Sequence, residues 1–154
     1  MKTRIATLAA ALVAAMLVSA CLFTPLASSQ QDTLAKEFIT HPDASTIYVY
    51  RSRFNHHDIE SILYLDGRIL GMTQPGTYYR IDTTPAAHTL HGTGSDSGQL
   101  MMDTRAGQIY FVALDVIGGH STFRVMPDEV GREQVRQCCQ LLETVVIGRG
   151  VTVR

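Results

Sequence analysis

The stretch SILYLDGRILGM, residues 61–72, predicts a β-hairpin and sets the expected fold class. Two largely apolar segments, residues 61–65 and 68–72, flank the dipeptide Asp66-Gly67. An Asp-Gly pair is typical of the two-residue type I′ turn, because both positions of that turn need a positive φ. We therefore expect two antiparallel strands joined by a tight turn.

Strand patterns continue on both sides of this hairpin. Further segments rich in apolar, aromatic or β-branched residues cover 47–50, 77–81, 88–91, 100–103, 108–117 and 122–126. Turn signals separate them, at Pro75-Gly76, 92–95, Ala106-Gly107 and Gly118-Gly119. Short strands at intervals of about 8 to 12 residues are typical of an antiparallel sandwich or barrel. We predict a mainly β fold, a small antiparallel β-sandwich of about seven strands.

The end of this domain has a helical period instead. Pro127 suits a first helical position, and Asp128 and Glu129 complement the positive end of a helix dipole. Apolar side chains then recur at helical spacing, at Val135, Cys138, Cys139, Leu142 and Val146. We expect one amphipathic helix from Asp128 to about Leu142 that packs on the sheet. The predicted domain covers residues 44–147, and residues 148–154 form a tail.

The N-terminus predicts export. Lys2 and Arg4 precede an apolar run, residues 5–20. As a helix this run would reach only ~24 Å, short of the roughly 30 Å hydrocarbon core of a bilayer. No charged stop-transfer cluster follows it. This pattern is typical of a signal peptide, here residues 1–20.

The end of the apolar run, Val18-Ser19-Ala20-Cys21, resembles the lipobox of bacterial lipoproteins. The resemblance implies cleavage before Cys21, a diacylglyceryl group on its sulfur and a further acyl chain on its amine. Two or more chains anchor a protein stably, whereas one chain binds only marginally. The alternative is an ordinary cleaved signal with a chance cysteine.

Two expectations about location follow from the lipobox. Leu22 stands where an Asp would retain a lipoprotein in the inner membrane, so the resemblance implies the outer membrane, facing the periplasm. Residues 21–43 are predicted to be the lipidated N-terminus and a polar tether that holds the domain away from the membrane surface.

Five short motifs in the domain occur in the order seen in one family. They are IYVYR, LYLDGRILG, GTYYRID, PAAHTL and AGQIYFVAL, between residues 47 and 114. They resemble the bacterial lipoproteins of the domain of unknown function 2846 family, and the hairpin is similar to that of PEGA-type surface domains. Ala86 departs from the family, which usually has Gly there. The resemblance implies a β-sandwich in the cell envelope and brings no established activity.

Composition excludes some partners. The chain has 154 residues and a formal net charge of -1, and its 13 Lys and Arg residues are scattered. No basic run would neutralise a nucleic-acid backbone, so we expect no nucleic-acid partner.

Cys138 and Cys139 are candidates for redox or metal chemistry. We expect no disulfide between them, because the Cα atoms of neighbours lie ~3.8 Å apart and bridged cysteines usually lie about 4.4–6.8 Å apart. No nearby Cys or His completes a zinc site. Free thiols packed as small hydrophobes are therefore predicted. An intermolecular bridge is the alternative.

Two loops invite a catalytic interpretation. The loop FNHHDIE, residues 54–60, contains His56 and His57, but adjacent side chains of an extended chain point to opposite faces. The loop GTGSDSG, residues 92–98, has Ser97 where a dinucleotide-binding loop needs Gly. We interpret both as solvated loops, and predict no catalytic residue, no metal and no cofactor.

The predicted function is a non-enzymatic binding or structural module for an envelope protein or polysaccharide. Loops at one end of a sandwich commonly carry recognition. The candidate partner-binding residues are Phe54, His56, His57, Asp58, Tyr50 and Tyr79. The two tyrosines can equally well fill the core. The alternative function is a metal-dependent enzyme or metal-binding protein that uses the His56/His57 loop.

Overall fold

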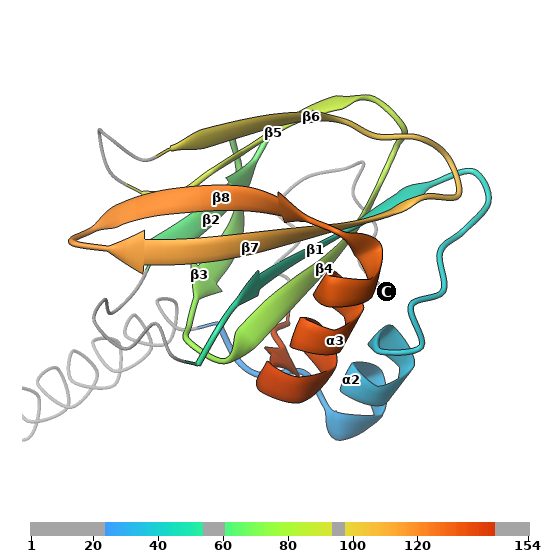
Figure 1. Cartoon of the computed structure of the whole chain (residues 1–154), viewed down its shortest axis with the longest axis horizontal. Coiled ribbons are helices and arrows are strands. Elements are labelled where there is room, and N and C mark those ends of the chain that lie inside the picture. Colours follow the sequence, from blue (N-terminus) through green and yellow to red (C-terminus); the bar gives the residue numbers. More distant parts are fainter. Residues whose placement is uncertain (1–23, 54–60, 94–97, 144–154) are drawn as a thin grey trace, which may run out of the picture.

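The computed structural model describes residues 24–53, 61–93 and 98–143. They form two stacked β-sheets, with two helices beside one of them (Figure 1). The five-stranded sheet has the order β8 (His120–Met126), β7 (Ile109–Ile117), β1 (Ser45–Arg51), β4 (Thr77–Thr83) and β9 (Gln140–Leu141). The four-stranded sheet has the order β3 (Arg68–Thr73), β2 (Ser61–Leu65), β5 (Ala87–His91) and β6 (Gln99–Asp103). The helices are α2 (Ser29–Ala35) and α3 (Asp128–Cys138). The prediction of a mainly β sandwich with a C-terminal helix is confirmed.

The hairpin at the centre of the prediction is present. Asp66 and Gly67 have φ values of 51° and 74°, as a type I′ turn requires. The Asp66 carboxylate also ties the turn to β5, because its Oδ1 accepts a hydrogen bond from the Thr89 N–H at 2.8 Å. The turn therefore sets the register of β2 with β3 and also contacts the neighbouring strand.

The sheets are not purely antiparallel, which corrects the sequence prediction. β1 pairs in parallel with β7, and β4 pairs in parallel with β9. Parallel neighbours need a long crossover connection. Here five strands lie between β1 and β7 in the chain. β2, β3, β5 and β6 belong to the other sheet, and β4 belongs to the same sheet as β1 and β7. The local pattern of a strand does not reveal which strand it will pair with.

Strand β1 is buried along its whole length because both faces of its sheet are covered. Ile47 and Val49 point into the space between the two sheets, and Tyr48 and Tyr50 point toward the helices. This alternation follows the two-residue period of a strand. We call the residues packed between the sheets the inner cluster: Ile47, Val49, Leu63, Leu65, Leu70, Tyr79, Ile81, Leu90, Met102, Val112, Leu114, Val116 and Leu142. The outer cluster lies under the helices: Ala35, Phe38, Tyr48, Tyr50, Tyr78, Phe111, Ala113, Val135, Cys139 and Leu141.

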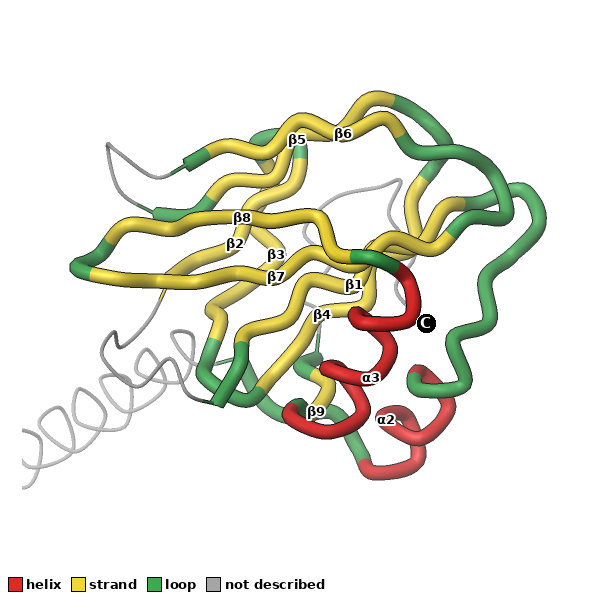
Figure 2. The backbone as a smooth tube through the Cα atoms, viewed as in Figure 1, coloured by secondary structure: helices red, strands yellow, loops and turns green. Residues whose placement is uncertain are grey.

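Helix α3 ends earlier than predicted. It stops at Cys138, and Cys139 has the extended backbone angles φ −133° and ψ 149°. The next two residues form β9 beside β4, at the end of α3 (Figure 2). Leu142 then lies in the inner cluster. The helical spacing failed here because a short apolar run fits a buried edge strand as well as a helix.

The tether predicted for residues 21–43 is wrong for its described part, which begins at residue 24. Thr24 is buried, and Leu26 forms a β-bridge with Leu142. Helix α2 begins with a capping box between Ser28 and Gln31. Its exposed polar residues gave the segment its linker-like composition, whereas Ala35 at its end is buried in the outer cluster. The segment is therefore part of the folded domain.

Candidate functional site

Most of the predicted contact residues lie outside the described residues, namely Phe54, His56, His57 and Asp58, as does the predicted lipidation site Cys21. Tyr50 and Tyr79 are described, and their exposed fractions are 3% and 1%. These two tyrosines fill the core, so the surface role proposed for them is wrong. Bulky rings on a strand covered on both faces have no route to solvent.

The two described histidines of the PAAHTL region have structural partners. The Nδ1 atom of His88 lies 2.7 Å from Oδ2 of Asp66, and its Nε2 lies 2.8 Å from the Thr84 carbonyl oxygen. His91 stacks on Tyr64 with their ring centroids 4.4 Å apart. Among the described residues, no group of three or more His, Cys, Asp or Glu side chains could hold a metal ion.

A cavity of about 530 Å³ lies where the connection from α2 to β1 passes over β4. Its lining combines apolar, charged and hydroxyl side chains: Leu34, Glu37, Ile39, Thr40, His41, Ala44, Arg80 and Asp82. Leu34 and Ile39 are 52% and 63% exposed, so both present apolar surface at the cavity. Mixed walls of this kind are typical of ligand sites.

The backbone after α2 shapes this cavity. Phe38 has a φ of 54°, a left-handed conformation that few non-glycine residues adopt. The turn buries the Phe38 ring edge-on against Tyr48 and Phe111, at centroid distances of 5.2 and 5.5 Å. It leaves Ile39, the next residue, exposed at the cavity wall.

Arg80 lines the cavity together with the carboxylates Glu37 and Asp82. Its Nη2 donates to the Ile39 carbonyl at 2.9 Å and lies 3.3 Å from Oδ2 of Asp82. Its Nε is buried and has no hydrogen-bond partner among the described residues. Asp82 is held in turn by Thr46, whose hydroxyl donates to Oδ1 at 2.7 Å. The guanidinium is thus fixed in place between the Ile39 carbonyl and the Asp82 carboxylate.

Buried tyrosines under the helices supply fixed hydrogen bonds to α2. Burial raises the pKa of Tyr48 to about 12, and its neutral hydroxyl donates to the Ala35 carbonyl at 2.6 Å. Burial also raises the pKa of Tyr78, and the nearby Asp32 carboxylate adds to that shift. The Tyr78 hydroxyl donates to Oδ1 of Asp32 at 2.9 Å. These bonds hold α2 on the sheet beside the cavity.

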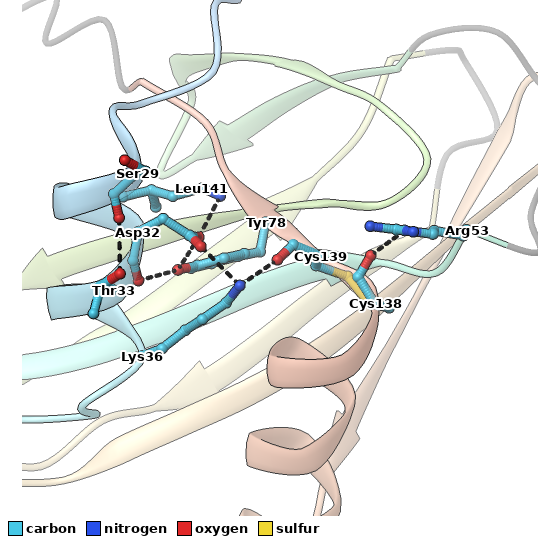
Figure 3. Close-up of polar contacts among 9 residues, drawn as sticks. All are labelled: Ser29, Asp32, Thr33, Lys36, Arg53, Tyr78, Cys138, Cys139 and Leu141. Atoms are coloured by element: carbon cyan, nitrogen blue, oxygen red, sulfur yellow. Dashed lines mark hydrogen bonds and ion pairs between the residues drawn. A yellow bond between two sulfur atoms is a disulfide. The ribbon is translucent and has the colours of Figure 1, made fainter.

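A second polar network surrounds the two neighbouring cysteines (Figure 3). Lys36 Nζ donates to the Cys139 carbonyl at 2.7 Å, and Arg53 Nε donates to the Cys138 carbonyl at 2.6 Å. The two side chains approach from opposite sides in Figure 3. Lys36 also pairs with Asp32 at 2.8 Å. Two cations thus fix the junction between α3 and β9.

Cys138 and Cys139 are joined by a disulfide, which corrects the prediction of free thiols. The usual Cα separation applies to cysteines that are distant in sequence and that folding brings together. Neighbouring cysteines can instead form a small ring, closed by the disulfide and the peptide bond between them. The end of α3 at Cys138 makes this arrangement accessible, because the two side chains no longer follow one helix.

Sequence reasoning missed the cavity and the Asp32 network. One signal was available in TYYRIDT, where Arg80 and Asp82 interrupt an otherwise buried strand on the face that also carries Tyr78. A second was the i, i+4 spacing of Asp32 and Lys36, which is typical of an ion pair on a helix. Their hydrogen-bond partners lie far away in the sequence, for example Tyr78 for Asp32 and Ile39 for Arg80, and no local pattern identifies them.

Comparison with known proteins gives a distant relative. The chain is 24% identical over 127 residues to an uncharacterised protein of Haemophilus influenzae, an alignment that covers 79% of this chain and 76% of the relative. No family model and no solved structure matches the chain. Neither helix in the described part of the chain is long and apolar enough to cross a membrane.

Proposed function

We propose that this chain is a cell-envelope lipoprotein, anchored through lipid on Cys21, whose β-sandwich is a non-enzymatic binding or structural module. The export pattern, the lipobox-like residues 18–21 and the resemblance to the domain of unknown function 2846 lipoproteins support the anchor. Leu22 supports an outer-membrane location facing the periplasm. The described fold begins at Thr24, so cleavage before Cys21 would remove no described residue.

The cavity beside α2 is the proposed binding site. The observation that supports this site is its mixed lining of apolar and charged side chains. Exposed Leu34 and Ile39 form apolar walls, and Arg80 supplies a fixed cation in the same lining. Apolar contact beside a fixed guanidinium favours ligands that carry an anionic group on an apolar body. A partner segment with a carboxylate next to an apolar side chain has this chemistry.

Binding is favoured over catalysis because Arg80, Asp82 and Thr40 of the cavity belong to one chain of polar contacts. Arg80 is bonded to Ile39 and Asp82, and Asp82 is bonded to Thr46. The hydroxyls of Thr40 and Thr46 lie 2.7 Å apart and complete the chain of contacts. Groups held in this way orient a ligand, whereas a nucleophile needs an adjacent base directed at a reacting atom.

The anchor is tested by the mass and fractionation of the protein. The membrane-extracted chain should begin at Cys21 and carry diacylglyceryl and acyl additions, and Cys21→Ser should leave the protein unlipidated. A mature protein cut at another residue and recovered in the soluble fraction would refute the anchor.

The cavity is tested with anilinonaphthalene sulfonate, a fluorescent anion with an apolar body. We expect Ile39→Glu to weaken its binding by roughly tenfold or more, because a carboxylate at the wall repels the sulfonate. Ile117→Glu is the matched control, since Ile117 is 69% exposed and is the last residue of β7, whose end lies across Figure 1 from α2. Equal binding by the two variants would place the dye elsewhere and reject the cavity.

A further inference from the structure

We infer that one defined face of the domain, the groove beside Thr24 that contains Arg53, lies against the phospholipid headgroups of the membrane. This inference rests on the proposed lipidation of Cys21 and goes beyond it, because it states which surface faces the bilayer.

The chain between the anchor and the fold is short. Only Leu22 and Phe23 separate Cys21 from Thr24. A fully extended chain advances at most ~3.6 Å per residue, so the three steps from residue 21 to residue 24 span no more than about 11 Å. A lipid on Cys21 therefore keeps Thr24 close to the headgroup layer, whatever path the chain takes.

Thr24 is firmly held by the fold. It is 4% exposed, and its Oγ1 accepts a hydrogen bond from the Met72 N–H at 2.8 Å. The Gln74 side chain donates to the Thr24 carbonyl at 3.3 Å. Gly71 permits this close approach, because a Cβ there would lie 2.8 Å from Thr24 Oγ1 and 2.5 Å from the Tyr79 hydroxyl. The domain thus moves with Thr24, and the surface around Thr24 is the described surface nearest to the proposed anchor.

The surface next to Thr24 is a groove of about 370 Å³. Gln74, which holds the Thr24 carbonyl, lines it together with Leu26, Arg53, Gly76 and Gln140. Leu26 is 47% exposed, so an apolar side chain stands two residues after the point where the chain arrives from the anchor. An exposed leucine beside a cation is the composition that suits the boundary between headgroups and acyl chains.

Arg53 is positioned to meet phosphate groups. Its Nε is bound to the Cys138 carbonyl, and its side chain lies across Gly76, where an added Cβ would be 2.8 Å from Arg53 Cγ. Among the described residues this guanidinium makes no other hydrogen bond. Its terminal nitrogens are therefore donors in the fork geometry that recognises phosphate.

The test uses the mature lipidated protein in vesicles of phosphatidylethanolamine and phosphatidylglycerol. A photo-crosslinking residue replaces Leu26 in one sample and Met101 in another, and lipid adducts are counted by mass spectrometry. Met101 is 80% exposed in β6, which lies across the molecule from the blue segment that starts the described chain (Figure 1). We expect roughly fivefold more lipid adduct or higher at position 26 than at position 101. Arg53→Glu should lower the adduct at position 26, and the exposed Arg105→Glu should leave it unchanged.

The possible results separate the two proposals. A chain without lipid on Cys21 overturns both the anchor and the orientation. A lipidated chain with equal adducts at positions 26 and 101, or with a protein adduct in place of lipid at position 26, overturns the orientation and leaves the anchor standing. Equal effects of Arg53→Glu and Arg105→Glu would remove Arg53 from the membrane contact.

Discussion

The two faces of the five-stranded sheet are built from different side chains, although the same strands supply both. The inner cluster is mainly aliphatic and meets the second sheet. The outer cluster is half aromatic and meets α2 and α3. Tyr48 and Tyr78 of the outer cluster each donate a hydrogen bond to α2. Stability should therefore depend on apolar volume at the inner face and on specific polar partners at the outer face.

Leu142→Asp should have the largest effect on stability. Leu142 is 1% exposed in the inner cluster, and an unpaired carboxylate buried there costs at least ~3 kcal/mol. The free energy of unfolding, measured by a denaturant titration followed by circular dichroism, should fall accordingly. Leu34→Asp is the control, because Leu34 is 52% exposed and should tolerate the charge. An unchanged midpoint for Leu142→Asp would mean that the C-terminal segment is not part of the inner cluster.

Alkaline pH should have the next largest effect, and it compares the two faces directly. Burial raises the pKa to about 12 both for Tyr48 of the outer cluster and for Tyr79 of the inner cluster. An unfolded tyrosine has a pKa near 10, so the folded state favours the neutral ring. The stabilisation is complete below pH 10 and is lost as the pH rises through 12, by ~2 kcal/mol for each tyrosine.

The absorbance of tyrosinate near 295 nm, with Tyr48→Phe and Tyr79→Phe to assign the transitions, checks this prediction. Both rings should ionise only near pH 12 or as the protein unfolds. Early ionisation of Tyr48 alone would show that the helices cover the outer face less tightly than the second sheet covers the inner one.

Asp32→Ala should weaken the outer face by ~2 kcal/mol, because it leaves buried donors without an acceptor. Oδ1 of Asp32 accepts from the Tyr78 hydroxyl and from the Leu141 N–H, each at 2.9 Å. Asp32→Asn keeps an acceptor oxygen at this position and should therefore retain most of the stability. Thermal melts of both variants check this. If the two variants had the same melting temperature, the charge of Asp32 and its ion pair with Lys36 would matter more than its hydrogen bonds.

Reduction of the Cys138–Cys139 disulfide should have the smallest effect. A bridge stabilises mainly by restricting the unfolded chain, and a loop of two residues gives only about 1 kcal/mol on that account. A thermal melt of the Cys138→Ser, Cys139→Ser double variant should show a correspondingly small decrease. A large decrease would indicate that the bridge maintains the contacts that Lys36 and Arg53 make with the two carbonyls.

Local patterns were sufficient for most strands and for the hairpin. The turn at Asp66-Gly67 and both of its strands were predicted because backbone preference and side-chain alternation act over a few residues. The length of α3 was overestimated because Cys139 and Leu142 suit a buried strand as well as a helix face. The predicted contact loop at residues 54–60 lies outside the described residues, so its role stays a prediction.

Local sequence patterns were enough to place β1 to β8 and the start of α3 at Asp128, and they predict an export signal followed by a lipobox-like cysteine. These features depend on side-chain period, backbone preference and covalent neighbours, which are all local. Three features became visible only in the folded chain. β1 lies parallel to β7, residues 24–43 pack on the domain, and Arg80 donates a hydrogen bond to the Ile39 carbonyl. Such pairings join residues far apart in the chain, and their free energy comes from burial and hydrogen bonds that exist only once both partners are in place.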